Sequence, residues 1–518
     1  MQLLTDFISH ADAQRHFSVD RLWDLFDGNR EKLNIAHECI DRHADSGLVA
    51  VRLANEDGTG EEITYREIAD LSACFAHWLI EIGVEKGDRV AIMLTPSLAF
   101  YVCLFGAMKA GAVAVPLFTL FGSEGLRLRV DDCSPKVVIT NTEKEPITRE
   151  LKGVIVKVAD QTFFDTLSKY PTTFQMNTSS ADMAIYQYTS GTSSGVPTPV
   201  RHTHRSVTLL MVAALYGTGI RPGDQMFCPS SIAWGHGLWH GTLAPLAMGV
   251  TTGTISGRFE PERLCKALQE YGITALTAAA THYRMMRTSG KASKYRYQVS
   301  KLSFTGEPID AATQVFLDET FHTSVCSMYG TTEVGTVLAC YPGAPDFKVK
   351  PGTLGKPTPG LRVAVHDASG NACAPGKVGE IVIFRSGNWI PTKDLGYIDE
   401  DGFFFYGGRA DDVIISSGWT MSAVEIENIL LMHPDVLEAA VIGVADAIRG
   451  LIPKAYIVSN RRGDDQFASE IQQFTKTKLS LHEYPRAVSF VTELPKTAAG
   501  KVNRRLLRVQ EDERKQTG

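Results

Sequence analysis

The sequence predicts an α/β fold: a large N-terminal domain built on doubly covered parallel sheets with an antiparallel β subdomain, followed by a small α+β C-terminal domain. In the first half of the chain, short apolar segments of strand length alternate with segments of helical periodicity, as in a parallel sheet covered on both faces. From Gly352 onward, short strands and Gly/Pro turns replace this alternation, which indicates an antiparallel subdomain. The last 100 residues or so restart the pattern at a size that folds alone.

Composition sets the first limits on function. A chain of 518 residues is long enough for two domains, and its 44% hydrophobic and 21% charged residues are values typical of a soluble globular protein. The net charge of −6 gives no general attraction to polyanions, so we expect no nucleic-acid partner. Nine cysteines without a C-x-x-C pair argue against structural zinc or a disulfide framework and favour a reducing compartment.

Neither targeting nor membrane insertion is expected. The N-terminus lacks a basic start followed by an apolar run, so we expect no signal peptide. Residues 99–122 are almost wholly apolar, but Lys109, Gly111 and Pro116 interrupt them. A buried helix from Ser97 to Lys109 and a buried strand from Ala112 to Pro116 explain this stretch better than a membrane span. We therefore predict a cytoplasmic protein with no membrane partner.

The remaining elements of the first part follow from periodicity and turn residues. Thr64 is expected to cap a helix that runs through Ile82, with Glu67 as its capping-box partner. Gly83 then ends that helix. The other predicted elements are an amphipathic helix at Leu33–Ala44 and strands at Val49–Leu53, Glu62–Tyr65, Arg89–Leu94, Val137–Thr140 and Gly153–Val158.

The segment YTSGTSSGVPTPVRHTHRSV, residues 188–207, combines hydroxyls and glycines without an acid. It follows a predicted buried strand, Met183–Tyr188, and is expected to lead into a helix that opens at His204. Glycine lets backbone N–H groups approach an anion, and hydroxyls add donors, so the segment is suited to cradle phosphate. A solvated surface loop is the alternative that composition leaves open. It is not a Walker loop, because Val196 follows Gly195 where a lysine is required.

The second half holds further ligand-binding candidates and the domain boundary. Glycine and hydroxyl residues follow two predicted strands, in FTGEP (residues 304–308) and YGTTE (residues 329–333), where open sheets bind ligands. We place the boundary near Gly408, which gives domains of residues 1–408 and 409–518. The C-terminal domain is expected to contain a helix whose inward face is Ala423, Ile426, Ile429 and Leu430, strands at Leu437–Val444 and Ala455–Val458, and a solvated tail.

Four separated segments together resemble one superfamily. They are YTSGTSSGVPTPV, YGTTE, DLGYIDEDGFFFYGGRADDVIISSGW and PKTAAGKVNR, in the order typical of the adenylate-forming enzymes, which comprise acyl-CoA synthetases, luciferases and peptide-synthetase adenylation domains. The early segment LNIAHECIDRHA is also similar to medium-chain, alicyclic and aromatic acid–CoA ligases of that group. The resemblance covers essentially the whole chain and implies an active site between a large domain and a small mobile one.

The resemblance implies a role for each motif. Catalysis would consist mostly of positioning a carboxylate and ATP and neutralising their charge. Glu333 would bind Mg²⁺, Thr332 would donate to the α-phosphate, and Lys501 would bridge the substrate carboxylate and the α-phosphate. Tyr329 would stack on adenine. The other implied nucleotide-binding residues are Thr189, Ser190, Gly191, Thr192 and Ser193 for the phosphates, Gly306, Glu307, Pro308, Gly330 and Thr331 around the base, and Asp394 and Arg409 at the ribose.

A second pose is implied for transfer of the acyl group. Asp411 matches the hinge about which the C-terminal domain rotates, and Gly418 would line a tunnel for the pantetheine arm of CoA. Taken singly, each of these residues also has a structural interpretation. Glu333 could complement a helix dipole, Asp394 and Asp411 could form turns, and Lys501 could be a surface lysine.

The chain departs from the pattern of the superfamily at three places. Thr198 stands where the phosphate loop usually carries lysine, which removes a positive charge near the triphosphate. Lys393 replaces a common glycine before the ribose-binding aspartate, and Ala423 replaces a common proline. None of these changes removes a residue with an implied catalytic role, but together they indicate a specialised branch.

The implied acid pocket is aromatic and apolar. Trp234 matches the position beside the carboxylate in aryl-CoA ligases, and its expected neighbours are Gly235, His236, Gly237, Ala279, Ala280, His282, Tyr283 and Val334. A pocket without arginine or lysine suggests a hydrophobic cyclic, aromatic or medium-chain acid. His236 is either a polar group of the pocket or a structural residue.

The sequence thus predicts an ATP-dependent carboxylic acid ligase that forms an acyl-AMP, releases pyrophosphate and passes the acyl group to CoA. An amide-bond synthetase resembling coronafacate ligase, with an amino acid as acceptor, is the alternative. A nucleotide-binding protein without transfer activity is a third possibility, against which Glu333, Asp394 and Lys501 argue. The acid, the acceptor and the oligomeric state are left open by the sequence.

Overall fold

The structure is a computed structural model that describes residues 2–188, 198–331, 334–409, 413–416, 419–446, 450–478, 484–497 and 500–517. The chain divides into two compact units. Unit 1 comprises Met1–Thr305, Leu317–Lys348 and Thr358–Gly360, and unit 2 comprises Gly306–Phe316, Val349–Pro357 and Leu361–Gly518. The domain boundary expected near Gly408 stays a prediction. Among the helices that the structure describes, none is long and apolar enough to cross a lipid bilayer.

Unit 1 contains a six-stranded sheet in the order β6-β5-β3-β4-β7-β8. The pairs from β6 to β7 are parallel, and β8 runs antiparallel to β7. β4 and β5 are fully buried and β3 is buried except at Arg89, as expected of a sheet covered on both faces. The bounds are β3 Arg89–Met93, β4 Val113–Pro116, β5 Val137–Thr140, β6 Ile155–Val158, β7 Met183–Tyr188 and β8 Pro199–Thr203.

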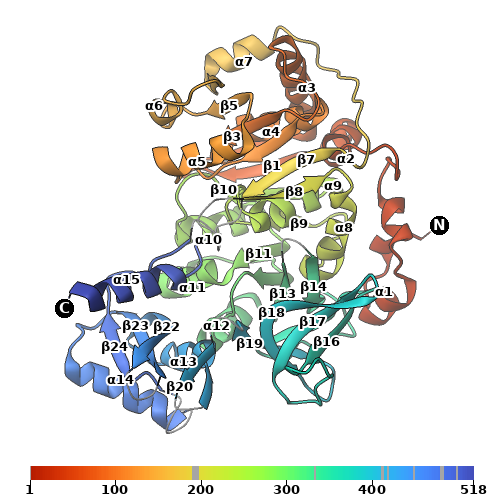
Figure 1. The fold of residues 1–518 in the computed structure, drawn as a ribbon. Coiled ribbons are helices and arrows are strands. Elements are labelled where there is room, and N and C mark those ends of the chain that lie inside the picture. The colour runs from red at the N-terminus through yellow and green to blue at the C-terminus, as the bar shows by residue number, and fades with distance from the viewer. Residues whose placement is uncertain are drawn as a thin grey trace. The chain divides into compact units, whose positions relative to one another are not determined.

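The helices around this sheet begin and end where local chemistry predicts. Thr64 and Glu67 form the predicted capping box of α3, and Ser97 caps α4. Gly83 has a φ of 84°, so it ends α3 in a conformation that other residues adopt at a cost. Helices α3 and α4 lie side by side next to the sheet (Figure 1). The bounds are α3 Tyr65–Glu81, α4 Leu98–Lys109, α5 Ser123–Cys133, α6 Glu145–Thr148 and α7 Gln161–Leu167.

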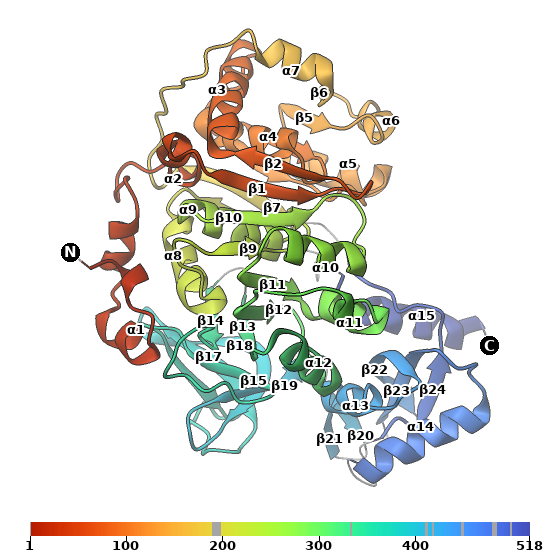
Figure 2. The ribbon, with the colours of Figure 1, turned by 180° about the vertical axis from the view of Figure 1, so that it is seen from behind.

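A second sheet of unit 1 has the order β14-β13-β12-β11-β9-β10-β1-β2. Figure 2 shows β10, β9, β11 and β12 following one another, with α10 and α11 beside them. The strands are β1 Val49–Ala54, β2 Gly60–Thr64, β9 Gln225–Phe227, β10 Thr251–Ile255, β11 Ala275–Ala279, β12 Lys301–Thr305, β13 Val325–Thr331 and β14 Gly335–Ala339. The helices of this region are α2 Ile35–Cys39, η3 Asp41–Ser46, α8 Ser206–Val212, the π-helices η4 Ala213–Thr218 and η5 His236–Leu243, α9 Ala244–Ala247, α10 Pro261–Glu270, α11 Ala280–Ser289 and η6 Ala292–Lys294.

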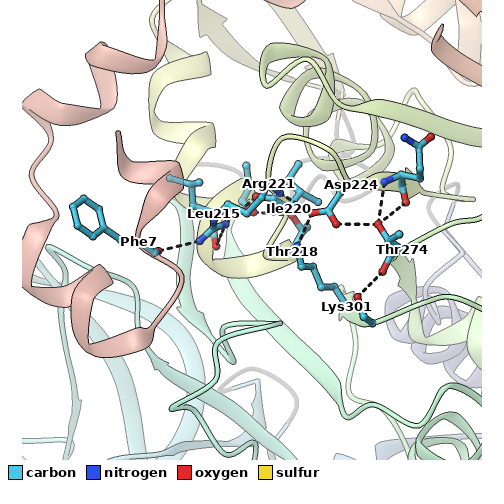
Figure 3. A network of polar contacts seen from close by, with 11 residues as sticks. Phe7, Leu215, Thr218, Ile220, Arg221, Asp224, Thr274 and Lys301 are labelled. Atoms are coloured by element: carbon cyan, nitrogen blue, oxygen red, sulfur yellow. Dashed lines mark hydrogen bonds and ion pairs between the residues drawn. The ribbon is translucent and has the colours of Figure 1, made fainter. Parts of the chain in front are cut away.

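Arg221 connects the N-terminal segment to this part of unit 1. The segment contains η1 Leu4–Asp6, α1 His10–His16 and η2 Asp20–Leu25. The Arg221 guanidinium donates to the carbonyls of Leu215 (2.9 Å) and Ile220 (2.8 Å), at the end of η4, and to that of Phe7 (3.3 Å) (Figure 3). Burial lowers the pKa of Arg221. The neighbouring Asp224 pairs with Lys301 at 2.5 Å, so this corner is held by polar contacts as well as by packing.

Unit 2 contains the antiparallel subdomain predicted from Gly352 onward, with neighbouring strands in the order β16-β17-β18-β19-β15. The bounds are β15 Thr353–Pro357, β16 Arg362–His366, β17 Gly379–Arg385, β18 Asn388–Ile398 and β19 Phe404–Arg409. The same unit contains α12 Ala311–Phe321 in part, up to Phe316. Asp310 begins this helix by accepting from the backbone N–H and hydroxyl of Thr313.

The C-terminal part of unit 2 is a sheet in the order β21-β20-β23-β22, with β24 paired to β23. Ala423, Ile426 and Leu430 are buried as predicted, whereas Ile429 is only partly buried. Helix α15 lies next to β22 (Figures 1 and 2). The bounds are β20 Val413–Ser416, β21 Trp419–Ser422, α13 Ala423–Leu430, β22 Val436–Asp446, β23 Gly450–Ser459, α14 Asp465–Lys478, β24 Ala487–Phe490 and α15 Arg504–Thr517.

One strand was missed and two local predictions were wrong. The helix expected to open at His204 is confirmed as α8, which begins at Ser206, but residues 199–203 before it form the unpredicted strand β8, antiparallel to β7. The predicted helix at Leu33–Ala44 is broken into α2 and the 3₁₀ turn η3, where Ile40 leaves helical geometry with φ −127°. The expected solvated tail is instead the helix α15, which is anchored by Glu511: its buried carboxylate accepts from Tyr456 at 2.6 Å and from Lys454 at 2.7 Å.

Candidate active site

The first three residues of the YGTTE motif lie on a strand of unit 1. Tyr329, Gly330 and Thr331 end β13, which pairs antiparallel with β14. A Cβ on Gly330 would lie 2.0 Å from the carbonyl oxygen of Gly335, so the close pairing of the two strands requires glycine there. Thr305, at the end of β12, donates to the carbonyl of Met328 at 2.7 Å, which ties the two neighbouring strand ends together. Tyr329 is partly buried and Gly330 is exposed.

Trp234 and His236 lie at the start of the π-helix η5. Their rings meet edge to face with centroids 5.3 Å apart. His236 is buried, with Nδ1 3.0 Å from the Ser230 hydroxyl and Nε2 2.9 Å from the Thr277 hydroxyl. Its ring is therefore fixed on both sides, and its orientation in turn supports Trp234. His236 thus has a structural role, and π-helical turns such as η5 are frequent at functional sites.

Gly235 is required by a close approach. A Cβ there would lie 2.7 Å from Nε2 of Gln187, at the end of β7. Gln187 is itself held in place, because its Oε1 accepts from the indole N–H of Trp239 at 2.7 Å. Gln187 and Trp239 were not among the predicted site residues, although the burial of β7 had been expected. Gln187, held by Trp239, thus limits the space beside Gly235.

Two other predicted pocket residues lie deep in the fold. Tyr283 is fully buried, and its hydroxyl donates to the backbone carbonyl of Ser303 at 2.8 Å. Ala280 is buried at the start of α11. The Ser303 side chain donates to the Thr277 hydroxyl at 2.9 Å, which is the same hydroxyl that contacts His236. Tyr283 and His236 thus belong to one polar cluster under strands β11 and β12, and Val334 lies at the β13–β14 turn.

In unit 2, a bulge in β18 positions Asp394. The register between β17 and β18 shifts between Glu380 and Val382, and Lys393 within this bulge has a φ of 62°. The backbone N–H of Lys393 donates to the Glu380 carboxylate at 2.8 Å, and that of Asp394 donates to the Thr392 hydroxyl at 3.1 Å. Bulges re-aim side chains next to active sites. Glu380 and Thr392, which the sequence did not single out, therefore set the direction of Asp394.

Arg409 and Lys501 are the predicted basic site residues that lie near Asp394 in unit 2. Asp394 and Arg409 are cross-strand partners on β18 and β19, and Oδ1 of the buried Asp394 lies 3.3 Å from Nη1 of Arg409. Lys501 is close enough to Glu307 and Asp394 for both carboxylates to raise its pKa, but burial has the larger effect and lowers it. The structure therefore brings Glu307, Asp394, Arg409 and Lys501 together in unit 2, while Gly306 and Pro308 flank Glu307 on exposed backbone.

The remaining predicted site residues lie outside the described residues: Thr189, Ser190, Gly191, Thr192, Ser193, Thr332, Glu333, Asp411 and Gly418. Among the residues that the structure describes, no three His, Cys, Asp or Glu side chains gather into a metal site. The roles proposed for the phosphate loop, the magnesium ligand, the hinge and the tunnel therefore stay predictions. The carboxylate of Asp394 has the acceptor chemistry that ribose hydroxyls need.

Comparison with known proteins gives the family. The profile described as AMP-binding enzyme matches residues 40–389, and that of the AMP-binding enzyme C-terminal domain matches residues 425–501. The chain belongs to the AMP-binding enzyme family. As a member of this adenylate-forming superfamily, it is a ligase that activates its substrate as an adenylate. Lys501 is the last residue of the C-terminal match, while Asp394, Arg409, Asp411 and Gly418 lie between the two matches.

Individual relatives cover nearly the whole length of this AMP-binding enzyme. It is 31% identical to an acetyl-coenzyme A synthetase of Bacillus subtilis, over 97% of this chain and 95% of that protein. A crystal structure of an acyl-CoA synthetase from Brucella canis matches 98% of this chain and 100% of its own, with a TM-score of 0.76 and 29% identity. A benzoate CoA ligase from Burkholderia xenovorans matches 92% and 100%, with a TM-score of 0.79 and 26% identity.

Proposed function

We propose that this protein is an ATP-dependent acid–CoA ligase: a carboxylate reacts with ATP to give acyl-AMP and pyrophosphate, and CoA then takes the acyl group as a thioester. The observation that carries the proposal is the gathering of Glu307, Asp394 and Lys501 in unit 2. Three sequence segments far apart in the chain contribute them, each from a motif that the family resemblance had singled out. A cluster of an acceptor carboxylate and a buried ammonium is suited to hold a ribose and to neutralise charge at a reacting phosphate.

CoA is proposed as the acceptor because relatives that match more than nine-tenths of this chain are named as CoA synthetases and ligases. ATP and CoA are substrates in this proposal. Mg²⁺, held by Glu333, would offset the negative charge of the triphosphate. The amino-acid acceptor is kept as an outcome of the test, because Thr198 in place of the usual loop lysine indicates a specialised branch.

For the acid we propose a hydrophobic cyclic, aromatic or medium-chain carboxylate. The predicted pocket positions carry no lysine or arginine that would pair with a second carboxylate. Trp234 packs edge to face on a histidine that is fixed by two hydroxyls, so a rigid aromatic wall is available. The alternation of the C-terminal domain about Asp411 belongs to the same proposal.

The test supplies acetate, hexanoate, cyclohexanecarboxylate or benzoate with ATP, Mg²⁺ and a mixture of CoA and amino acids, and identifies products by mass. A CoA thioester of one of the last three acids supports the proposal. An amide would move the protein to the amide-bond synthetases, and the absence of AMP with every acid would favour nucleotide binding without transfer. A preference for acetate would remove the hydrophobic-acid proposal alone.

The role of Lys501 is tested by separating the two half-reactions. Lys501→Ala should reduce acyl-AMP formation by about 10²-fold or more, because its ammonium stabilises charge in that transition state. Transfer to CoA from chemically prepared acyl-AMP should stay nearly unchanged. An equal fall in both half-reactions would contradict the assigned role.

A further inference from the structure

The backbone around Lys501 forms a closed loop. The N–H of Thr497 donates to the carbonyl of Lys501 at 2.7 Å, and the N–H of Gly500 donates back to the carbonyl of Thr497 at 2.8 Å. The Lys501 N–H donates to the Thr497 hydroxyl at 3.3 Å. At the base of the loop, the N–H of Asn503 donates to the carbonyl of Pro495 at 2.7 Å. The described residues on the two sides of this loop (residues 495–503, of which 498 and 499 are not described) are therefore bound to each other, and their placement depends on what the base of the loop is attached to.

One ion pair, between a buried carboxylate and a partly buried guanidinium, attaches that base. Helix α15 begins at Arg504, three residues after Lys501. The Arg504 guanidinium contacts both carboxylate oxygens of Glu427, through Nη2 at 2.5 Å and Nε at 3.2 Å. Oε1 of Glu427 also accepts from the backbone N–H of Val441 at 2.7 Å. Glu427 is 7% exposed, so a single buried carboxylate joins α13, β22 and the first residue of α15.

The geometry of this contact is suited to fixing position. A guanidinium bound through two nitrogens to one carboxylate is constrained in distance and in orientation, unlike a lysine ammonium. A buried pair of this kind contributes little net stability compared with apolar residues of the same volume. Its specific effect is to fix the position of the base of the loop relative to α13 and β22, and thereby the position of the Lys501 ammonium.

We propose that Glu427 and Arg504 are positioning residues for Lys501, holding its loop where the ammonium serves adenylation. This inference rests on the proposed function of Lys501. The pair touches neither substrate nor nucleotide in the proposed reaction. It acts through the three-residue connection from Arg504 to Lys501.

The same helix offers a matched control. Seven residues after Arg504, the buried carboxylate of Glu511 accepts from Tyr456 at 2.6 Å and from Lys454 at 2.7 Å on β23. This second anchor holds the middle of α15 to the sheet independently of Glu427. Glu511→Gln therefore weakens the docking of the helix while leaving the base of the loop in place.

The experiment measures acyl-AMP formation and, separately, thioester formation from prepared acyl-AMP in the full-length protein. Arg504→Gln and Glu427→Gln should each slow acyl-AMP formation by roughly 10- to 100-fold, the loss expected for a catalytic group misplaced by about 1 Å. Thioester formation should change by less than about threefold, because the proposal gives Lys501 no part in it. The double variant should be no slower than either single one, since the two residues act as one unit. Arg504→Lys, which keeps the charge but loses the two-nitrogen contact, should recover part of the rate.

Three results decide between the explanations. If Lys501→Ala leaves acyl-AMP formation intact, the proposed function of Lys501 is wrong. If Lys501→Ala blocks acyl-AMP formation but Arg504→Gln does not slow it, the positioning role is wrong. The positioning role is also wrong if Arg504→Gln slows both half-reactions to the same extent, or if Glu511→Gln, which leaves the base of the loop in place, slows acyl-AMP formation as much as Arg504→Gln does. Should Arg504→Gln fail to fold, Arg504→Lys carries the same comparison, with far-ultraviolet circular dichroism as the check on folding.

Discussion

Lys393 has a left-handed backbone, with a φ of 62°, in the middle of β18. The family resemblance led us to expect glycine there, and the bulge beside Glu380 gives a physical reason: a left-handed residue with a Cβ costs about 1–2 kcal/mol. The Lys393 side chain is exposed, so it offers no packing to offset that cost. The strain is instead held by the hydrogen bond from its N–H to Glu380, which also directs the next residue, Asp394.

The strain at Lys393 gives a stability prediction. Lys393→Gly should be neutral or raise the free energy of unfolding by up to about 1 kcal/mol, because the relief of backbone strain exceeds the entropic cost of glycine. Lys393→Val should lower it by about 1–2 kcal/mol, since a β-branched residue tolerates this conformation least. Urea unfolding of the three proteins measures the order. A glycine variant less stable than the unmodified protein would contradict the strain at this position.

Lys501 gives a prediction for the pH dependence of adenylation. Burial lowers the pKa of its ammonium, and the nearby Glu307 and Asp394 offset this only in part. The charged form that adenylation needs is present below the pKa of the folded protein and is lost as the pH rises through it. The alkaline fall in acyl-AMP formation should therefore begin at a lower pH than for an ordinary lysine.

The pH dependence of the two half-reactions is compared on one protein preparation. Thioester formation from prepared acyl-AMP, followed over the same pH range, should lack this alkaline fall. Two results would contradict the assignment to Lys501: an adenylation rate that does not fall until the pH reaches the ordinary pKa of a lysine, or a fall that both half-reactions share.

At the scale of elements, His204 connects the chain after β8 to the start of α2. Its Nδ1 accepts from the backbone N–H of Ile35 at 3.1 Å, and the ring is fully buried. Burial lowers the pKa of His204 to about 4, although Asp182 works in the opposite direction. The neutral ring is therefore the form that the fold requires, because protonated Nδ1 could not accept this hydrogen bond.

This histidine should make the protein sensitive to mild acid. The folded pKa lies below the unfolded value of 6.5, so the stabilisation is present above 6.5 and is lost as the pH falls toward 4. Between pH 7 and pH 5 the free energy of unfolding should fall by about 2 kcal/mol from this group. Urea unfolding at both pH values measures the loss. His204→Asn, whose amide oxygen can accept from Ile35, should remove most of it; an unchanged pH dependence would assign the effect to another group.

The elements that the sequence predicted and those that it missed differ in a physical way. Helices α3 and α4 and the buried strands β3, β4, β5 and β7 follow from local periodicity and caps, such as the Thr64–Glu67 box. Strand β8 was missed because buried and exposed residues alternate only weakly along it. Its pairing with β7 is a contact between separate segments, which local sequence patterns do not reveal. Helix α15 was read as a solvated tail because it is highly charged, yet Glu511 is buried through long-range pairs with β23.

The candidate site divides in the same way. Motifs located Asp394, Arg409 and Lys501, because the residues that carry the chemistry are local in sequence. The residues that aim them were not predicted. Glu380 and Thr392 act through a bulge, and Glu427 lies 77 residues before its partner Arg504. Such support depends on which strands and helices meet, which a single sequence does not state.

At the scale of the whole molecule, the two family matches leave residues 390–424 between them. This segment contains the ribose-binding candidates Asp394 and Arg409 and also the predicted hinge Asp411 and tunnel residue Gly418. In the proposed reaction, Lys501 serves the first half-reaction and Gly418 the second. A protein that uses the two at different times needs a change in pose between them, and the predicted hinge at Asp411 in this connecting segment would supply it.

Gly418→Leu tests this division at the level of the complete reaction. Gly418 lies outside the described residues, so the prediction rests on the family resemblance: a side chain in a narrow pantetheine passage should block CoA. Acyl-AMP formation should remain within about threefold of the unmodified protein, while thioester formation should fall by about 10²-fold or more, the scale expected when reactants cannot reach a productive geometry. Pyrophosphate release and thioester mass report the two steps. Gly418→Ala, which adds a single carbon, is the graded control and should fall between the two. If Gly418→Leu forms thioester at the normal rate, CoA does not pass this residue, and the acceptor must enter by another route or be a smaller amine.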